Sequence, residues 1–292
     1  MSNLPVFIAP LFCLLVLQSP PAVSTYRLEP TDTPTIKKRY TAEQLGVLEK
    51  LNRRDLEHLI RLDAIVVPDT WTDELSFSPL PADWPAAQAH VKALVVDQPS
   101  QLFGAYEAGK LVRWGPVSSG RKETPTPAGE FTLTWRAKTR RSTDNEQWVL
   151  KWYFNFVNAR GVSFHQFDLP GVAASHACVR LLERDARWVY DWGQEWTLSP
   201  DRKTVLATGT PVVIVGTYAF DRPAPWLSLE WWKQRIVLPS VLTGGGSTAA
   251  DLRPIEDEVD HHDDEDPQHR RLEDEPKMLH WNFELGTLNS EL

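Results

Sequence analysis

One of the two cysteines in this chain has basic side chains on both sides. Cys178 follows His176 by two residues and precedes Arg180 by two, and His165 lies thirteen residues upstream. A cysteine attacks as its thiolate, and a nearby imidazole or guanidinium lowers the thiol pKa and makes the thiolate available. These residue types favour a cysteine nucleophile paired with a histidine base. The alternative that spacing alone leaves open is a buried cysteine with incidental histidines.

Two other uses of these residues fit less well. Zinc would find only three soft ligands in His165, His176 and Cys178, without a CxxC pair, so we expect no metal and no cofactor. A papain-like protease places its cysteine before its histidine, whereas in this chain His165 comes first.

The N-terminus is typical of an export signal. Its apolar run from Leu4 to Leu17 is shorter than the ~20 residues that a membrane helix needs, and Ala22-Val23-Ser24 fits a cleavage site. We expect residues 1–24 to be a signal peptide and the protein to be exported to the periplasm or cell envelope, without a stable membrane span. The alternative is an uncleaved anchor. Cleavage would leave Cys178 unable to form an intramolecular disulfide, so its retention suggests a use.

Negative charge is concentrated near the C-terminus. The net charge is −8, whereas residues 251–276 alone carry 12 acidic and 3 basic side chains. The residues after them add −1, so residues 25–250 sum to about +2 and have no basic stripe, and we expect no nucleic-acid partner. We expect residues 243–292 to form a disordered acidic tail. Weak metal binding at His261 and His262 is the alternative use of this tail.

The first part of the chain is helical in pattern. After an N-terminal extension at residues 25–39, leucines recur at three- and four-residue spacings through residues 40–68, and Thr41 with Gln44 fits a capping box. Two short helices followed by a strand distantly resemble the later part of a LysM-type glycan-binding module, with a plain helical subdomain as the simpler interpretation. Residues 69–90, which are rich in proline, are expected to be a linker packed on the surface.

The period then changes to that of strands. Residues 91–216 predict a mostly antiparallel β domain with a single later helix near residues 182–196, and residues 217–242 predict an extension packed on that domain. The expected strands are residues 91–97, 101–106, 110–117, 130–136, 148–157, 161–165 and 211–216. The fold class is therefore mainly β (α+β).

Three motifs in this β region carry a family resemblance. SHACVRL (175–181) resembles the SHGC[IV]R signature of the L,D-transpeptidases, whose catalytic domain is of the YkuD type. LPGVAASH (169–176) is similar to the loop that leads into the cysteine, and TPTPAGEF (124–131) matches the TPxGxF element. The resemblance covers about 125 residues from Val91 to Val215, with the motifs in the family's order.

The resemblance implies a YkuD-like β-sandwich and a set of site residues. Cys178 would be the nucleophile, His165 the general base that activates it, and the backbone N–H groups of Cys178 and Ala177 the oxyanion donors. The residues that would shape the site and hold its loop are Ser175, His176 and Arg180.

Two residues depart from the family's pattern. Ala177 replaces the glycine before the cysteine, and Gln166 replaces the glycine after the histidine. If position 177 requires a positive φ, alanine there costs about 1 kcal/mol or more of strain.

The reaction that the resemblance implies is acyl transfer through a thioester on a peptidoglycan tetrapeptide stem. A neighbouring stem's amine as acceptor gives a 3→3 cross-link, water makes the protein an L,D-carboxypeptidase, and a protein amine makes it an anchoring enzyme. The main alternative from another class is a catalytically inactive peptidoglycan-binding protein, which Ala177 and Gln166 motivate. The expected partners are peptidoglycan stem peptides, and the protein is expected to be a monomer.

Overall fold

The computed structural model describes residues 25–31, 33–142 and 145–243, which belong to one compact unit. The signal peptide expected at residues 1–24 and all but the first residue of the expected acidic tail, with His261 and His262, lie outside the described residues. Within the described ranges, no helix is long and apolar enough to span a membrane.

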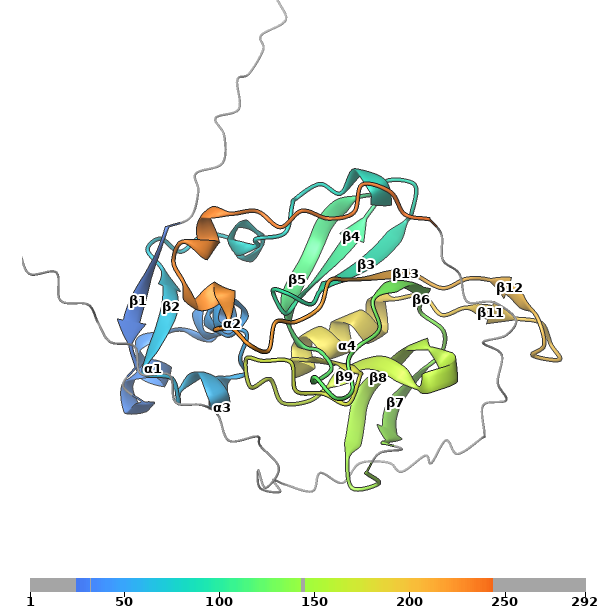
Figure 1. The fold of residues 1–292 in the computed structure, drawn as a ribbon, viewed down its shortest axis with the longest axis horizontal. Helices are drawn as coiled ribbons and strands as arrows, with labels where there is room; N and C mark the ends of the chain where they lie inside the picture. The colour runs from blue at the N-terminus through green and yellow to red at the C-terminus, as the bar shows by residue number, and fades with distance from the viewer. Residues whose placement is uncertain (1–24, 32, 143–144, 244–292) are drawn as a thin grey trace, which may run out of the picture. The chain divides into compact units, whose positions relative to one another are not determined.

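The fold is mainly β, as the sequence predicts, and it centres on one nine-stranded mixed sheet (Figure 1). The strand order is β6-β13-β3-β4-β5-β10-β9-β8-β7, with parallel pairing in β13–β3 and β10–β9 and antiparallel pairing elsewhere. The strands are β3 (Lys92–Asp97), β4 (Leu102–Glu107), β5 (Lys110–Ser118), β6 (Gly129–Thr132), β7 (Arg136–Arg141), β8 (Val149–Val157), β9 (Val162–Gln166), β10 (Val179–Leu181) and β13 (Pro211–Val215).

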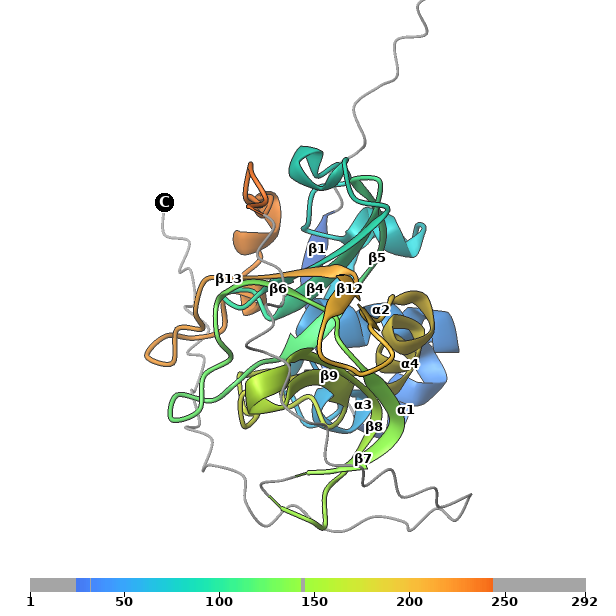
Figure 2. The same cartoon turned by 90° about the vertical axis from the view of Figure 1, so that its right-hand side faces the viewer.

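This sheet curls on itself, so the expected two-sheet sandwich is instead one continuous sheet. Its first half (β6, β13, β3, β4, β5) meets its second half (β10, β9, β8, β7) where β5 pairs with β10 over only two residue pairs, Ser118 with Arg180 and Val117 with Leu181. Figures 1 and 2 show β3–β5 and β7–β9 on opposite sides of this junction. Helix α4 (Glu183–Trp192) packs against β8, β9 and β10.

Alternating side chains let the first half of the sheet bury both of its faces. Leu94 and Val96 of β3 join the core that α4 also enters, whereas Ala93 and Val95 join a second core on the other face. Successive side chains of a strand point to opposite faces, so a strand covered on both sides becomes continuously apolar. The run KALVVD has this pattern.

The N-terminal segment folds as two strands around three helices. Strands β1 (Tyr26–Pro30) and β2 (Ala64–Pro68) pair antiparallel. The sequence between them forms α1 (Thr33–Arg39), α2 (Ala42–Asn52) and α3 (Leu56–Leu59). The expected capping box is present, because Thr41 accepts from the backbone N–H of Gln44 and the Gln44 side chain accepts from that of Thr41. Asp55 caps α3 by accepting from the N–H of His58.

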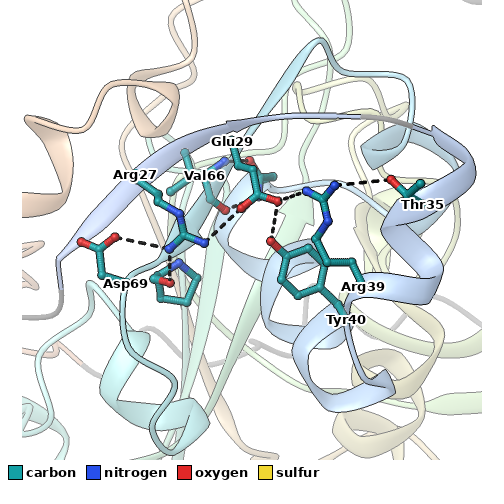
Figure 3. A network of polar contacts seen from close by, with 9 residues as sticks. Arg27, Glu29, Thr35, Arg39, Tyr40, Val66 and Asp69 are labelled. Carbon is teal, nitrogen blue, oxygen red and sulfur yellow. Dashed lines mark hydrogen bonds and ion pairs between the residues drawn. The ribbon is translucent and has the colours of Figure 1, made fainter.

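A polar network ties β1 to the helices that follow it (Figure 3). The Glu29 carboxylate accepts from the Tyr40 hydroxyl at 2.7 Å and from Arg27 at 3.0 Å, and it pairs with Arg39. Partial burial raises the pKa of Glu29, but the hydrogen bonds from Tyr40, Arg39 and Arg27 outweigh it and hold that pKa below its usual value. Arg27 also donates to the Pro68 carbonyl at 3.0 Å, which joins the network to the end of β2.

Two segments outside the sheet complete the second core. Residues 69–90 contain the short 3₁₀ turns η1 (Glu74–Phe77) and η2 (Pro85–Ala87), and Leu80 and Trp84 there are almost fully buried. Leu80 and Trp84 are thus part of the core, so this segment does more than lie on the surface. The domain boundaries at residues 69 and 90 stay predictions. The remaining short elements are η3 (Asn158–Arg160), β11 (Thr197–Leu198), β12 (Val205–Ala207), η4 (Pro225–Leu227) and η5 (Trp231–Lys233).

The C-terminal extension surrounds a buried arginine of the N-terminal segment. The rings of Trp226, Trp231 and Trp232, here called the tryptophan cage, have their centroids 5.1–5.3 Å from the Arg53 guanidinium carbon. Arg53 donates through Nε to the Ser100 carbonyl at 2.9 Å. This single side chain therefore connects α2, the β3–β4 turn and the extension.

Candidate active site

The thiol of Cys178 lies at the junction of the two halves of the sheet. Cys178 immediately precedes β10, is partly exposed, and forms no disulfide within the described residues. Because β10 runs parallel to β9 with Val179 opposite Phe164, the register places Cys178 beside Ser163. The Sγ atom is 3.5 Å from the Ser163 hydroxyl oxygen and 3.8 Å from the Gly161 carbonyl oxygen. Strand pairing thus determines which polar groups surround the thiol.

His165 shares a strand face with Ser163, since residues two apart on a strand point the same way. Its ring is buried, and Nδ1 lies 3.0 Å from the Gln166 carbonyl oxygen, a contact that requires the proton on Nδ1 and leaves Nε2 as the acceptor. Burial lowers the pKa of His165 to about 4, the Gln166 carbonyl opposes this shift, and the charge of Arg180 adds to it. The imidazole is therefore neutral at neutral pH and can accept a proton.

Arg180 lies beside both of these residues. It is opposite His165 in the β9–β10 register and two residues after Cys178, with its guanidinium carbon 4.6 Å from the Phe167 ring centroid. Its Nη1 is 3.5 Å from the Asp168 carbonyl oxygen. Burial lowers the pKa of Arg180 to about 10, so the group stays charged at neutral pH. A fixed positive charge near Cys178 favours its thiolate.

The loop before Cys178 is held by the end of β5. The backbone N–H of Ser175 donates to the Ser119 carbonyl at 3.0 Å, and that of Arg121 donates to the Ser175 carbonyl at 2.8 Å. The Ser175 hydroxyl donates to the Cys178 carbonyl, closing a turn around the cysteine. Ser175 therefore ties the loop before Cys178 to the segment that follows β5.

Ala177 adopts a backbone conformation that favours glycine. Its φ is +78°, which answers the question that the sequence raised about this position. An L-residue in this region costs roughly 1–2 kcal/mol relative to its ordinary conformations. The side chain is buried against the core that also contains Val179, so the methyl group gains contacts that partly offset the strain. The loop before the cysteine is therefore strained.

His176 lies on the outer side of the site. Its ring centroid is 5.1 Å from that of Trp148, which is also 5.9 Å from that of Phe167. The other two tryptophans near the motifs point elsewhere, because Trp135 packs on Tyr153 and Trp152 packs on Tyr190 of α4. Of these three rings, Trp148 is the one that contacts a residue of the loop before the cysteine.

Sequence reasoning missed a chain of polar side chains behind the thiol. The Tyr153 hydroxyl donates to the Gly161 carbonyl at 2.9 Å, Asn155 Nδ2 donates to the Tyr153 hydroxyl at 3.0 Å, and Thr134 donates to Asn155 Oδ1 at 2.8 Å. Ser163 and Asn155 are fully buried. Polar residues that alternate with aromatic ones in VLKWYFNFV and VSFHQ were the available signal, because buried polar groups need partners.

A cleft of about 620 Å³ opens between the N-terminal segment and the region around the end of β9 and the start of α4. It is lined by acidic and basic side chains, including Glu49, Asp55 and Arg184, together with Gln166. Neighbouring residues of a strand point to opposite faces, so Gln166 turns toward this cleft while His165 shares the face of Ser163 and Cys178. Gln166, the second departure from the family's pattern, thus contributes to a surface that glycine would leave open.

The comparisons with known proteins agree with the motifs. The family model of the YkuD L,D-transpeptidase catalytic domain matches residues 91–214, from the start of β3 to the end of β13. A search of curated proteins finds no match.

Solved structures that resemble the chain are L,D-transpeptidases. That from Stackebrandtia nassauensis is 24% identical, with 46% of this chain and 57% of that one covered and a TM-score of 0.36. The L,D-transpeptidase from Mycobacterium smegmatis is 19% identical (43% and 59% covered, TM-score 0.34), and L,D-transpeptidase 1 from Mycobacterium tuberculosis is 21% identical (43% and 62% covered, TM-score 0.33). The chain thus spans less than two thirds of each of these proteins. Residues 91–214 are a YkuD L,D-transpeptidase catalytic domain.

Proposed function

We propose that this protein is an exported peptidoglycan L,D-transpeptidase in which Cys178 carries the acyl group. The observation that carries the proposal is the placement of the Cys178 thiol beside the strand that carries the neutral, buried imidazole of His165. The charge of Arg180 supports it, because a nearby cation stabilises the thiolate. The family of residues 91–214 supports peptidoglycan as the substrate.

Acylation begins with transfer of the thiol proton to Nε2 of His165. The sulfur attacks the carbonyl carbon that joins an L-centre to the terminal D-amino acid of a tetrapeptide stem, and the oxygen becomes an oxyanion. Backbone N–H groups at Cys178 and Ala177 stabilise that charge. The C–N bond then breaks, His165 returns the proton to the departing amine, and a thioester remains on Cys178.

An amine on a neighbouring stem resolves the thioester. The amine attacks the thioester carbonyl, His165 takes the proton that the amine loses, and the thiolate leaves and regains a proton. The product is a 3→3 cross-link. Water in place of the amine would give an L,D-carboxypeptidase product, and a protein amine would give an anchored protein.

Acylation by a carbapenem separates an active enzyme from a binding protein. The purified chain is incubated with a carbapenem and analysed by intact-mass spectrometry, with Cys178→Ala as the control that removes the adduct. We expect one adduct on the wild-type protein and none on the variant. A wild-type protein that forms no adduct and converts no tetrapeptide stem would identify an inactive binding protein.

The choice of acceptor is read from the products. Tetrapeptide stems are incubated with the enzyme, and the products are separated and weighed by mass spectrometry. A dimer that has lost one D-amino acid indicates transpeptidation, and a tripeptide indicates hydrolysis. His165→Ala should slow acylation by about 10²–10⁴-fold, the usual contribution of a general base. Acylation of that variant at the full rate would remove His165 from the mechanism.

Export is tested through the first 24 residues. Fusing them to a reporter that is active only outside the cytoplasm should give signal, and the N-terminal sequence of the mature protein should begin at Thr25. A mature protein that still begins at Met1 would indicate an anchor instead.

A further inference from the structure

The peptide bond between Ala177 and Cys178 is held from one side by a threonine of the TPxGxF element. The Thr126 hydroxyl donates to the Ala177 carbonyl oxygen at 2.8 Å and accepts from the backbone N–H of Gly120 at 2.8 Å. The side chain is only 3% exposed, so water does not compete for either bond. A threonine hydroxyl has one proton to donate, and here that proton goes to the residue before the cysteine.

The backbone around Gly120 fixes the position of this hydroxyl. A Cβ atom at Gly120 would lie 2.2 Å from the Thr124 carbonyl oxygen and 2.4 Å from the Thr126 nitrogen, distances that no side chain tolerates. Glycine therefore lets the end of β5 approach the TPxGxF segment closely enough for the Gly120–Thr126 bond to form. The hydroxyl is fixed to the first half of the sheet before it reaches across to Ala177.

The contact between Thr126 and the Ala177 carbonyl also sets the direction of the Cys178 N–H. The C=O and the following N–H point in opposite directions across a planar trans peptide, so a fixed Ala177 carbonyl also fixes the Cys178 N–H. Because the Ala177 carbonyl points inward to Thr126, the Cys178 N–H points the other way. That N–H is one of the two oxyanion donors of the proposed mechanism.

We infer that Thr126 is a positioning residue that aims the Cys178 N–H at the oxyanion by holding the Ala177 carbonyl. The inference rests on the proposed function, since only an acyl-transfer reaction forms that oxyanion. The positive φ of Ala177 makes the contact more important here than with glycine, because this strained conformation must be held by its neighbours. Thr126 itself touches neither substrate nor sulfur.

Two electrophiles distinguish this role from a general structural one. Iodoacetamide alkylates the thiolate without forming an oxyanion, whereas a carbapenem acylates it through a tetrahedral oxyanion. Thr126→Val keeps the shape of the side chain but loses both hydrogen bonds. We expect its carbapenem acylation to slow by about 10–100-fold, somewhat less than outright loss of an oxyanion donor, while alkylation stays within about twofold of the wild type and keeps its pH midpoint.

Two further variants serve as controls. Thr126→Ser keeps the hydroxyl and should recover most of the acylation rate. Thr210→Val removes another buried threonine hydroxyl, which accepts from the Gln194 N–H at 3.0 Å on the far side of β13, and should acylate at the wild-type rate. All rates are measured at a temperature well below the unfolding midpoint of each variant.

The outcomes separate the two proposals. If Thr126→Val acylates as fast as the wild type, the role of Thr126 is wrong. If its alkylation and acylation slow equally, Thr126 supports the loop as a whole and does not aim the N–H, which also overturns the inference. A wild-type protein that alkylates but is never acylated would instead overturn the proposed function, and the oxyanion role of Thr126 with it.

Discussion

Two arginines, one in the N-terminal segment and one in the candidate active site, hold their guanidinium groups against aromatic rings. Arg53 is fully buried, whereas Arg180 is partly exposed. Arg53 lies in the tryptophan cage, and Arg180 lies over the Phe167 ring. In the described part of the chain, neither guanidinium bonds to a carboxylate, and both donate to backbone carbonyls. Burial lowers the pKa of Arg53 to about 9 and that of Arg180 to about 10, so both remain positive at neutral pH.

The two arginines differ in what lies within reach of the charge. Arg53 donates to carbonyls of two segments that must stay together, α2 (Lys50 and Leu51) and the β3–β4 turn (Ser100). Arg180 acts on Cys178 and on the imidazole opposite it. The same residue type is therefore placed for stability where its neighbours are carbonyls and rings, and for the proposed chemistry where Cys178 is close.

Two buried histidines repeat this contrast. His58 and His165 are 3% and 4% exposed, but His58 Nδ1 lies 2.7 Å from the Asp55 carboxylate whereas His165 Nδ1 meets only a carbonyl. A carboxylate partner favours the imidazolium, and burial without one favours the neutral ring. In the N-terminal segment the Asp55 carboxylate supplies a negative charge beside the His58 ring. In the candidate active site the His165 ring has a neutral carbonyl in that place.

Acid unfolding provides the largest test of this contrast. The pKa of His165 in the folded protein, about 4, lies below its unfolded value of about 6.5, so the stability is fully present above pH ~6.5 and is lost as pH falls toward 4. The free energy of unfolding should fall by about 3 kcal/mol between these two pH values. Urea unfolding at several pH values should show a flatter profile for His165→Gln. Equal flattening in the matched variant His58→Gln would break the contrast.

Replacing Arg53 should affect stability and leave reactivity unchanged. Arg53→Met removes its hydrogen bonds and its contacts with the tryptophan cage, and we expect a loss of about 2 kcal/mol of unfolding free energy after the relief of a buried charge is included. Chemical denaturation measures the loss. The iodoacetamide rate of Cys178 in the folded variant should match the wild type, and a change in that rate would show that the charge reaches the thiol.

Replacing Arg180 should have the opposite pattern. Arg180→Met keeps an aliphatic chain over Phe167 but removes the cation, so the pKa of the Cys178 thiol should rise and alkylation near neutral pH should slow about tenfold. The pH dependence of alkylation reports the thiol pKa. Arg180→Lys keeps the charge and should behave more like the wild type; if it is as slow as Arg180→Met, the effect comes from packing.

The smallest expected effect belongs to Ala177. Ala177→Gly relieves the positive φ but loses a buried methyl group and gains chain entropy when unfolded, so the variant should be more stable by about 0.5–1 kcal/mol at most. Thermal unfolding checks the sign. A destabilised variant would mean that core contacts of the methyl group outweigh the strain.

The pattern of apolar residues predicted most of the sheet, because buried strands repeat every two residues. The expected strand at residues 130–136 is instead the end of β6 and the start of β7, with Leu133 buried between them. Strand β7 carries RAKTRR on an edge, where exposed polar residues hide the period. Strand β10 has three residues, too few for any period to register.

The active-site residues fall into two groups by how they could be found. Cys178 and His165 stand out because cysteine and histidine are residue types that can react, and the motifs contain them. Ser163 and Thr126 act through contacts between segments that are fifteen and fifty-one residues apart in the sequence, and only the strand pairing and the close turn at Gly120 bring them together. The alternation in VSFHQ signals that Ser163 is buried but not what it contacts, and the Thr126 hydroxyl is indistinguishable in the sequence from that of a surface threonine.

The short pairing of β5 with β10 divides the site between two structural units. Gly120 and Thr126 lie in the connection between β5 and β6 of the first half of the sheet, whereas His165 lies on β9 of the second half. Cys178 lies one residue before β10, which pairs with both β5 and β9. Neither half contains both His165, the proposed base, and Thr126, which holds the Ala177 carbonyl. Covalent labelling of the thiol by a carbapenem should therefore count natively assembled molecules, so that a single titration reports the active fraction of any preparation.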